Sequence, residues 1–225
     1  MKNTLLMSLV VILILACVIG GGIFWINNSN QRFNVNQMSI SKLTSKNIKL
    51  DELNNIDLNV RTAKIVIEEA DTNSVTLENV TSHEVTVDND QSSLKISQEN
   101  SNKHQLEIGK SPVIIIRVKQ NLNSIKINQL NGTLNLHKLN VDNMKIDHVN
   151  GSTIINNLKL KNGGTINKKN GKTELDKVNI PGLKVKVKTG AFKLNGTKKS
   201  NSYNDNHATQ LIINSNTGQV SVDTK

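Results

Sequence analysis

Alternating apolar and polar residues dominate the chain from Ile56 onward. Short runs such as "IDLNV", "KIVIEE" and "SVTLENV" place an apolar residue at every second position, and no run with helical spacing competes with them. Because successive side chains point to opposite faces of a strand, each run predicts a short β-strand with one buried face. The run "PVIIIRV", Pro112 to Val118, is apolar nearly throughout, which is typical of a strand buried on both faces.

A repeat becomes visible when four glycines are taken as reference points. Gly132, Gly151, Gly171 and Gly190 lie 19, 20 and 19 residues apart. Apolar residues recur seven and five positions before each glycine, two and four positions after it, and in most copies seven and nine positions after it. The clearest members are Ile125, Ile127, Leu134, Leu136, Leu139, Val141, Met144, Ile146, Ile155, Leu158, Leu160, Ile166, Leu175, Val178, Ile180, Leu183, Val185, Phe192 and Leu194. A shorter copy around Gly218 follows "GTKKSNSYNDNHATQ", which we expect to be a loop.

The constant repeat length decides between two interpretations. Taken alone, Asn131-Gly132 predicts a two-residue β-hairpin turn. Hairpin loops vary freely in length, however, whereas each turn of a coil has to stack in register on its neighbour. We therefore predict an all-β fold, a parallel β-solenoid with rungs of 19–20 residues, in preference to an antiparallel sandwich or barrel. Glycine would occupy the sharpest corner, and the Asn before it would hydrogen-bond along the stack.

The N-terminal residues have a different character. Leu5 to Ile26 contains no charged residue, and 22 helical residues rise about 33 Å, enough to cross a hydrocarbon core of roughly 30 Å. Phe24 and Trp25 would lie at the membrane interface, and Lys2 favours a cytoplasmic N-terminus. We predict an anchor at 1–27, a polar spacer at 28–55 and a solenoid outside the cell at 56–225.

Two features leave alternatives open. "ILAC", ending at Cys17, resembles a bacterial lipobox, in which the cysteine is lipidated, although the apolar run continues beyond it. The stretch from Ile56 to Ser97 departs from the repeat, and we expect irregular first rungs or a cap over the open edge.

Positive charge is concentrated in one part of the chain. Twelve lysines and two acids lie between Asn157 and Ser200, a balance of +10 that equals the net charge of the whole chain. In "LKVKVK", Leu183 to Lys188, alternation turns the lysines outward, and lysines of neighbouring rungs would lie about 4.8 Å apart. We expect a polyanion-binding face formed by Lys168, Lys169, Lys172, Lys184, Lys186, Lys188 and Lys193. The alternative is that these lysines keep a repetitive fold soluble and block edge-to-edge pairing.

The residue pattern gives little support to catalysis. The five histidines have no metal-ligand spacing, and we expect all of them, including His137 and His148, on the solvated surface. Polysaccharide-active enzymes with β-helices need clustered carboxylates, but Glu174 and Asp176 are the only acids in the basic segment. We predict no catalytic residue, no metal and no cofactor.

The layout from Ile56 to Lys225 is similar to a known family. An irregular alternating stretch, "IDLNVRTAKIVIEEADTNSVTLENV", precedes repeats of the form apolar-x-apolar-x-x-apolar-Asn/Thr-Gly-x-apolar-x-apolar. This layout resembles a bacterial domain-of-unknown-function family of adhesin-like proteins, with members among the accessory membrane proteins of Lia-type cell-envelope stress loci. The resemblance implies an extracytoplasmic β-solenoid and offers no site residues.

Together these observations predict a single-pass, non-enzymatic binding or structural module of the bacterial cell envelope. Its partners would be the membrane and teichoic acid or anionic lipid, and not nucleic acid, because aromatic residues for base stacking are lacking. One alternative is a regulatory accessory protein that acts through a membrane-protein partner. Another is a lipid-anchored polysaccharide-active enzyme.

Overall fold

The computed structural model describes residues 2–225, with side chains from residue 6 onward. The chain forms two compact units. The first comprises Met1–Thr44 with Gln105–Lys110, and the second comprises Ser45–His104 with Ser111–Lys225.

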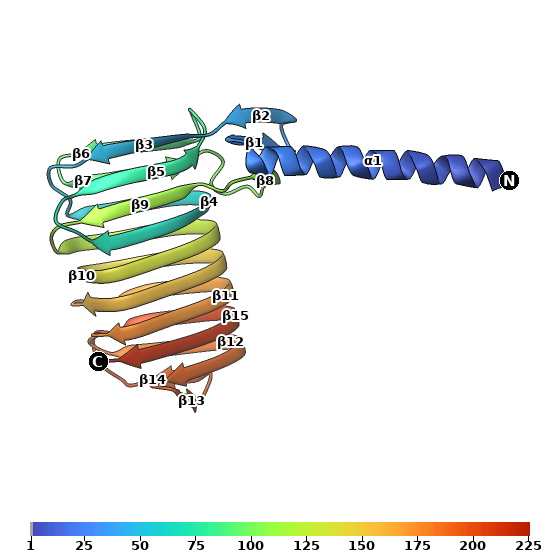
Figure 1. Cartoon of the computed structure of the whole chain (residues 1–225). Coiled ribbons are helices and arrows are strands. Elements are labelled where there is room, and N and C mark those ends of the chain that lie inside the picture. Colours follow the sequence, from blue (N-terminus) through green and yellow to red (C-terminus); the bar gives the residue numbers. More distant parts are fainter. Residues whose placement is uncertain (1) are drawn as a thin grey trace. The chain divides into compact units, whose positions relative to one another are not determined.

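The first unit combines a long helix with a small antiparallel sheet (Figure 1). Its elements are α1 (Lys2–Asn28), β1 (Gln31–Asn34), β2 (Ser39–Lys42) and β8 (Glu107–Gly109), and the strand order is β2-β1-β8. The range 28–55, where the sequence predicts a spacer, contains β1, β2 and a further strand, β3 (Thr44–Lys49). Their short length explains why alternation is hard to detect there.

The second unit contains the remaining strands. They are β3 (Thr44–Lys49), β4 (Asn55–Glu69), β5 (Ser74–Val80), β6 (Val85–Asp90), β7 (Ser93–Gln98), β9 (Val113–Val118), β10 (Leu122–Leu160), β11 (Gly164–Val178), β12 (Leu183–Leu194), β13 (Thr197–Lys199), β14 (Ser202–Asn204) and β15 (Leu211–Thr224). The chain is thus mostly β, as predicted.

Parallel pairing links the repeats of the second unit. β10 pairs in parallel with β4 on one side and with β11 on the other, and β11 pairs in parallel with β15. The glycines are in register: Gly151 lies opposite Gly171, and Gly132 lies opposite Ala63 of β4. β4 is therefore a further copy of the repeat, which the sequence pattern missed because alanine replaces the glycine.

The order of the repeats in space differs from their order in the sequence. β15, the last copy, lies between β11 and β12 (Figure 1). Gly218 therefore separates Gly171 from Gly190. The segment before β15, where the sequence predicts a loop, carries β13 and β14, and both pair with β12 in antiparallel orientation. They cover the edge of the sheet that β12 would otherwise expose. An uncovered edge strand has unpaired N–H and C=O groups that can pair with another chain.

Glycine is required at the corner of each repeat. Gly132, Gly151, Gly171, Gly218 and Gly190 all have φ between +114° and +138°. A β-carbon on any of them would overlap the carbonyl oxygen of the corner residue in the adjacent repeat. The prediction that glycine occupies the sharp corner is confirmed.

The predicted asparagine stacking is also confirmed. Asn150 Nδ2 donates to Asn131 Oδ1 over 3.0 Å, and Asn170 Nδ2 donates to Asn150 Oδ1 over 2.8 Å. Inside the corners, the core is formed mainly by Ile, Leu and Val, with Phe192 as its one fully buried phenyl ring in the described part of the chain.

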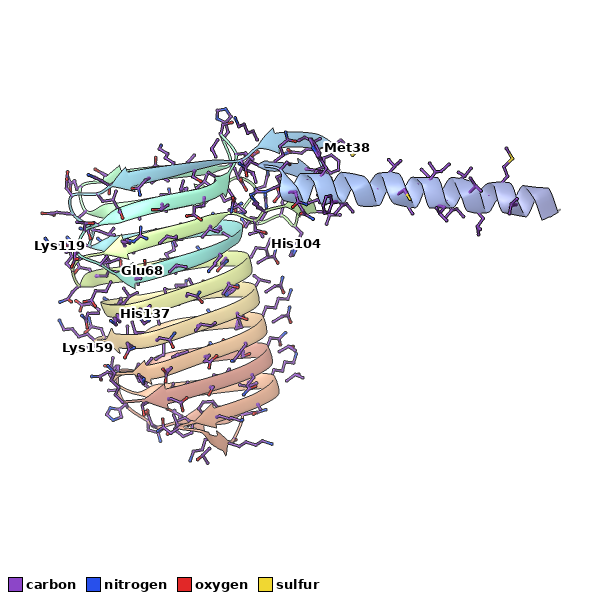
Figure 2. All side chains as sticks on the ribbon, viewed as in Figure 1. Met38, Glu68, His104, Lys119, His137 and Lys159 are labelled. Atoms are coloured by element: carbon purple, nitrogen blue, oxygen red, sulfur yellow. The ribbon has the colours of Figure 1, made fainter. Side chains whose placement is uncertain are left out.

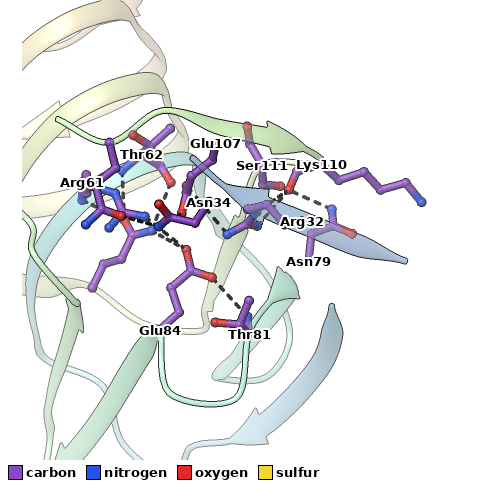
Figure 3. A network of polar contacts seen from close by, with 12 residues as sticks. Arg32, Asn34, Arg61, Thr62, Asn79, Thr81, Glu84, Glu107, Lys110 and Ser111 are labelled. Carbon is purple, nitrogen blue, oxygen red and sulfur yellow. Dashed lines mark hydrogen bonds and ion pairs between the residues drawn. The ribbon is translucent and has the colours of Figure 1, made fainter. Parts of the chain in front are cut away.

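A buried polar network closes the corner of β4. The Glu84 carboxylate accepts hydrogen bonds from Gln98 Nε2 (2.8 Å) and from the Thr81 backbone N–H (3.1 Å), and it lies 3.8 Å from Arg61 Nη2 (Figure 3). Gln98 Oε1 accepts from the backbone N–H groups of Arg61 and Thr62. The charge of Arg61 is therefore compensated in the interior.

Candidate functional site

The basic pocket is a cavity of about 510 Å³ on the second unit, next to the glycine corner. Four neighbouring strands, β10, β11, β15 and β12, contribute to it. β10, β11 and β15 each contribute two outward-facing residues and the inward-facing residue between them, and β12 contributes two outward-facing lysines. The residues that line it are Asp147, His148, Val149, Asn167, Lys168, Lys169, Lys186, Lys188, Asn214, Ser215 and Asn216.

One wall of the basic pocket is a column of side chains in register. Asn167 Nδ2 donates to Asp147 Oδ1 over 2.7 Å, and Asn214 Nδ2 donates to Asn167 Oδ1 over 3.0 Å. The next residue in register with Asn214 is Lys186. Along the wall, a carboxylate is thus followed by two carboxamides and then by an ammonium group. These groups can form hydrogen bonds with neutral and anionic groups of a ligand that lies along the column.

Three exposed lysines supply the charge of the basic pocket: Lys169 on β11, and Lys186 and Lys188 on β12. The predicted alternation in "LKVKVK" is confirmed, since Lys184, Lys186 and Lys188 are exposed and the residues between them are buried. The spacing between repeats was predicted wrongly. β15, with its neutral Asn214 and Asn216, separates β11 from β12, so lysines of these strands are two strand spacings apart, roughly 10 Å.

Three other predicted site residues lie outside the basic pocket. Lys172 is ion-paired with Glu174, Lys184 lies opposite Asn204 of β14, and Lys193 lies opposite Lys198 of β13. All three lysines are exposed. The structure thus divides the predicted lysine face into a pocket cluster and scattered surface residues.

Lys168 does not belong to an exposed face, and its predicted position was wrong. Its side chain is 3% exposed, and Nζ has no hydrogen-bond partner. Burial without a counter-charge lowers the pKa of Lys168 from 10.5 to about 7. The cause is its position in the strand. Gly164 and Ile166 face inward, and because every second residue faces the same side, Lys168 faces inward as well, just before the corner.

His148, in register with Lys168, was also placed wrongly on the surface. It is 1% exposed, with Nδ1 2.9 Å from Thr153 Oγ1 and Nε2 2.9 Å from the Asn150 carbonyl oxygen. Burial, and secondly the charge of Lys168, lower the pKa of His148 to about 4. The other four histidines are exposed, as predicted, including His137 (Figure 2).

These two residues belong to a buried polar row that the sequence analysis overlooked. Gln129 and Ser215 occupy the same position, three residues before the corner glycine, and both are buried. Gln129 Nε2 donates to the carbonyl oxygens of Ala63 and Asn131. The signal was present in the sequence, because each of these polar residues lies two positions after an inward-facing isoleucine.

Comparison with protein families matches residues 53–225 to the family described as Toastrack DUF4097. The chain belongs to the Toastrack family. The predicted resemblance to an adhesin-like domain of unknown function is thereby confirmed.

One solved structure supports the same fold for this Toastrack protein. A crystal structure of a "putative cell adhesion protein" from Clostridium sporogenes is 15% identical, covers 82% of this chain and 100% of its own, and has a TM-score of 0.59. A "putative adhesin" from Bacteroides fragilis is 14% identical and covers 82% of this chain and 97% of its own, with a TM-score of 0.35. The comparison with curated proteins found no match.

Among the described residues, no three His, Cys, Asp or Glu side chains are close enough together to hold a metal ion. Glu174 is engaged by Lys172, and Asp176 lies at the next outward position of β11. The lining of the basic pocket consists mainly of charged and carboxamide side chains, with the aliphatic stems of the lysines between them.

Proposed function

We propose that this Toastrack protein is a membrane-anchored, non-enzymatic binding module of the bacterial cell envelope. In this proposal the parallel ladder is one β-solenoid lying outside the cell, and the N-terminus of the chain is cytoplasmic. The basic pocket binds an anionic cell-wall polymer such as teichoic acid.

The anchor is supported by the surface of α1. Its segment Leu6–Asn28 has a mean hydropathy of 2.9 and is long enough to cross a membrane, although a signal sequence meets the same criterion. Large apolar side chains are exposed along it, from Leu6 (66%) to Phe24 (71%), while Ile26 at its end is buried. Lipid would remove this apolar surface from water.

The observation that carries the binding proposal is the position of Lys169, Lys186 and Lys188 around one cavity. Among the described residues, no carboxylate lies within ion-pair distance of these three lysines. Asp147, the acid in the pocket, lies 3.9 Å from Lys145 and accepts a hydrogen bond from Asn167. Positive charge therefore predominates, and an anionic chain would be attracted. Phosphate groups would contact the lysines, and hydroxyl groups would hydrogen-bond to the carboxamides of the wall.

The test is binding of the full chain in nanodiscs to purified teichoic acid at increasing salt concentration. We expect binding at about 0.05 M salt and its loss at about 1 M, where the screening length falls to about 3 Å. An uncharged cell-wall polysaccharide of similar length is the control. Absence of teichoic acid binding at low salt would contradict the proposal.

A further inference from the structure

We propose that one face of the small sheet in the first unit is immersed in the outer interface of the lipid bilayer beside α1. The inference rests on the anchoring part of the proposed function and is independent of the basic pocket.

The sheet β2-β1-β8 has two chemically different faces. Phe33 of β1 lies directly opposite Ile40 of β2 and Ile108 of β8. Directly opposed residues in antiparallel strands share a face, so these three side chains form an apolar row across the sheet. Leu106, two positions before Ile108, and Val35, whose N–H donates to the Leu106 carbonyl oxygen, continue this face at the same end.

The apolar face is open to the surroundings of the unit. Ile40 is 55% exposed and Leu106 is 62% exposed, and Met38, in the turn that leads into β2, is 77% exposed (Figure 2). In the described part of the chain, these three are the only large apolar residues so exposed outside α1. Burying an exposed Ile, Leu or Met contributes substantially to partitioning out of water.

The opposite face is polar and internally satisfied. Arg32 is 3% exposed, and its Nε and Nη2 donate to the Lys110 carbonyl oxygen over 3.0 and 2.8 Å. Gly109, directly opposite Arg32, lies against the end of α1: a β-carbon there would be 3.4 Å from Ile26 Cγ2. α1 therefore packs at the polar face, and the apolar face is left uncovered.

Lipid is the occupant that fits this arrangement. α1 contacts both β1 and β8, so the sheet adjoins the end of the apolar helix (Figure 1). Phe24 and Trp25 are exposed near this end. Exposed apolar side chains therefore occur both on α1 and on the sheet of this unit. Lys42 and Lys110, both exposed, lie at the other end of the sheet from Leu106, where they can reach phosphate groups while their stems cover apolar surface.

The test uses site-directed spin labels in the full chain, reconstituted in nanodiscs of phosphatidylglycerol and phosphatidylcholine. The native Cys17, the single cysteine of the chain, is labelled first. Ile40→Cys and, as a second site, Leu106→Cys are labelled in a Cys17→Ser background. Lys95→Cys, on the exposed surface of the second unit, is the aqueous reference. Each label is measured for accessibility to oxygen, which concentrates in lipid, and to a water-soluble nickel chelate.

We expect labels at positions 17, 40 and 106 to favour oxygen over the nickel chelate, shifted toward lipid relative to position 95. If position 17 is in lipid but 40 and 106 match position 95, the inference is overturned while the anchor stands. Shielding of 40 and 106 from both reagents would indicate a protein partner and would also overturn it. A label at position 17 in water would overturn both the anchor and the inference.

Discussion

Gly218 lies so close to Gly171 that a β-carbon on Gly218 would overlap the Gly171 carbonyl oxygen. The two residues are 47 positions apart, yet they are neighbours in the corner column because β15 lies between β11 and β12. The last copy of the repeat is therefore part of the interior of the sheet, and its corner has no space for a side chain.

Substitution of this corner glycine should be costly. We expect Gly218→Ala to lower the free energy of unfolding by at least about 2 kcal/mol, because φ is +138° and backbone atoms must move. Gly196→Ala is the matched control, since φ is +72° there but no atom lies within 4 Å of the new carbon; it should cost about 1–2 kcal/mol. Urea unfolding of both variants measures the difference, and equal losses would argue against the close approach.

The Asn column should contribute measurably to stability. Asn150 links Asn131 and Asn170, so Asn150→Ala removes two hydrogen bonds and should cost about 1–2 kcal/mol in urea unfolding. Asn150→Thr is a conservative comparison, because Thr62 and Thr217 occupy this position in other copies. It should cost less than the alanine variant. A neutral effect of Asn150→Ala would mean that the column contributes nothing.

The buried histidine should make stability depend on pH. The pKa of His148 is about 4 in the folded chain and 6.5 in the unfolded chain, so between these values the unfolded chain binds the additional proton. Stability should therefore rise as the pH increases from 4 to 6.5, with a slope of up to about 1.4 kcal/mol per pH unit. His148→Gln, which introduces the residue found at position 129, should flatten this slope, and the exposed His137→Gln should not. An unchanged slope in His148→Gln would contradict the assignment.

Lys168 should destabilise the fold at neutral and acidic pH. Its pKa of about 7 in the folded chain, against 10.5 when unfolded, means that stability rises as the pH increases from 7 to 10.5. Lys168→Met should raise the free energy of unfolding at pH 7 by about 1–3 kcal/mol and remove that rise. Lys169→Met, its exposed neighbour, should change stability by less than about 0.5 kcal/mol. Thermal unfolding at pH 7 and pH 9.5 distinguishes the two variants, and destabilisation by Lys168→Met would show that Nζ has a stabilising partner.

The sequence predicted the strands, the corner glycines and the Asn column, because all three depend on local alternation and a fixed repeat length. The position of β15 depends on pairing between residues that are 47 positions apart. A repeat of 19–20 residues predicts only that each copy pairs with the next one in the sequence, so it could not predict this pairing. The inward position of His148 and Lys168 could have been predicted by extending the alternation from Ile146 and Ile166 to the corner. Their polarity favoured the surface, and the phase of the strand overrode it.

The basic pocket was predicted only in part. Lys169, Lys186 and Lys188 were among the expected binding residues, but their grouping around one cavity depends on the inserted β15. The amide wall was not expected, because Asn167 and Asn214 become neighbours through the same insertion.

The most direct test of the account is a comparison of two triple variants in teichoic acid binding. Lys169, Lys186 and Lys188 are changed to Gln in one variant, and Lys64, Lys95 and Lys119, exposed lysines remote from the pocket in sequence, are changed to Gln in the other, so that both lose three charges. At low salt we expect the pocket variant to bind roughly tenfold more weakly, about 0.5 kcal/mol per lysine, and the control variant to bind nearly as tightly as the unmodified chain. Equal weakening of the two variants would mean that only net charge matters and would contradict a defined binding site.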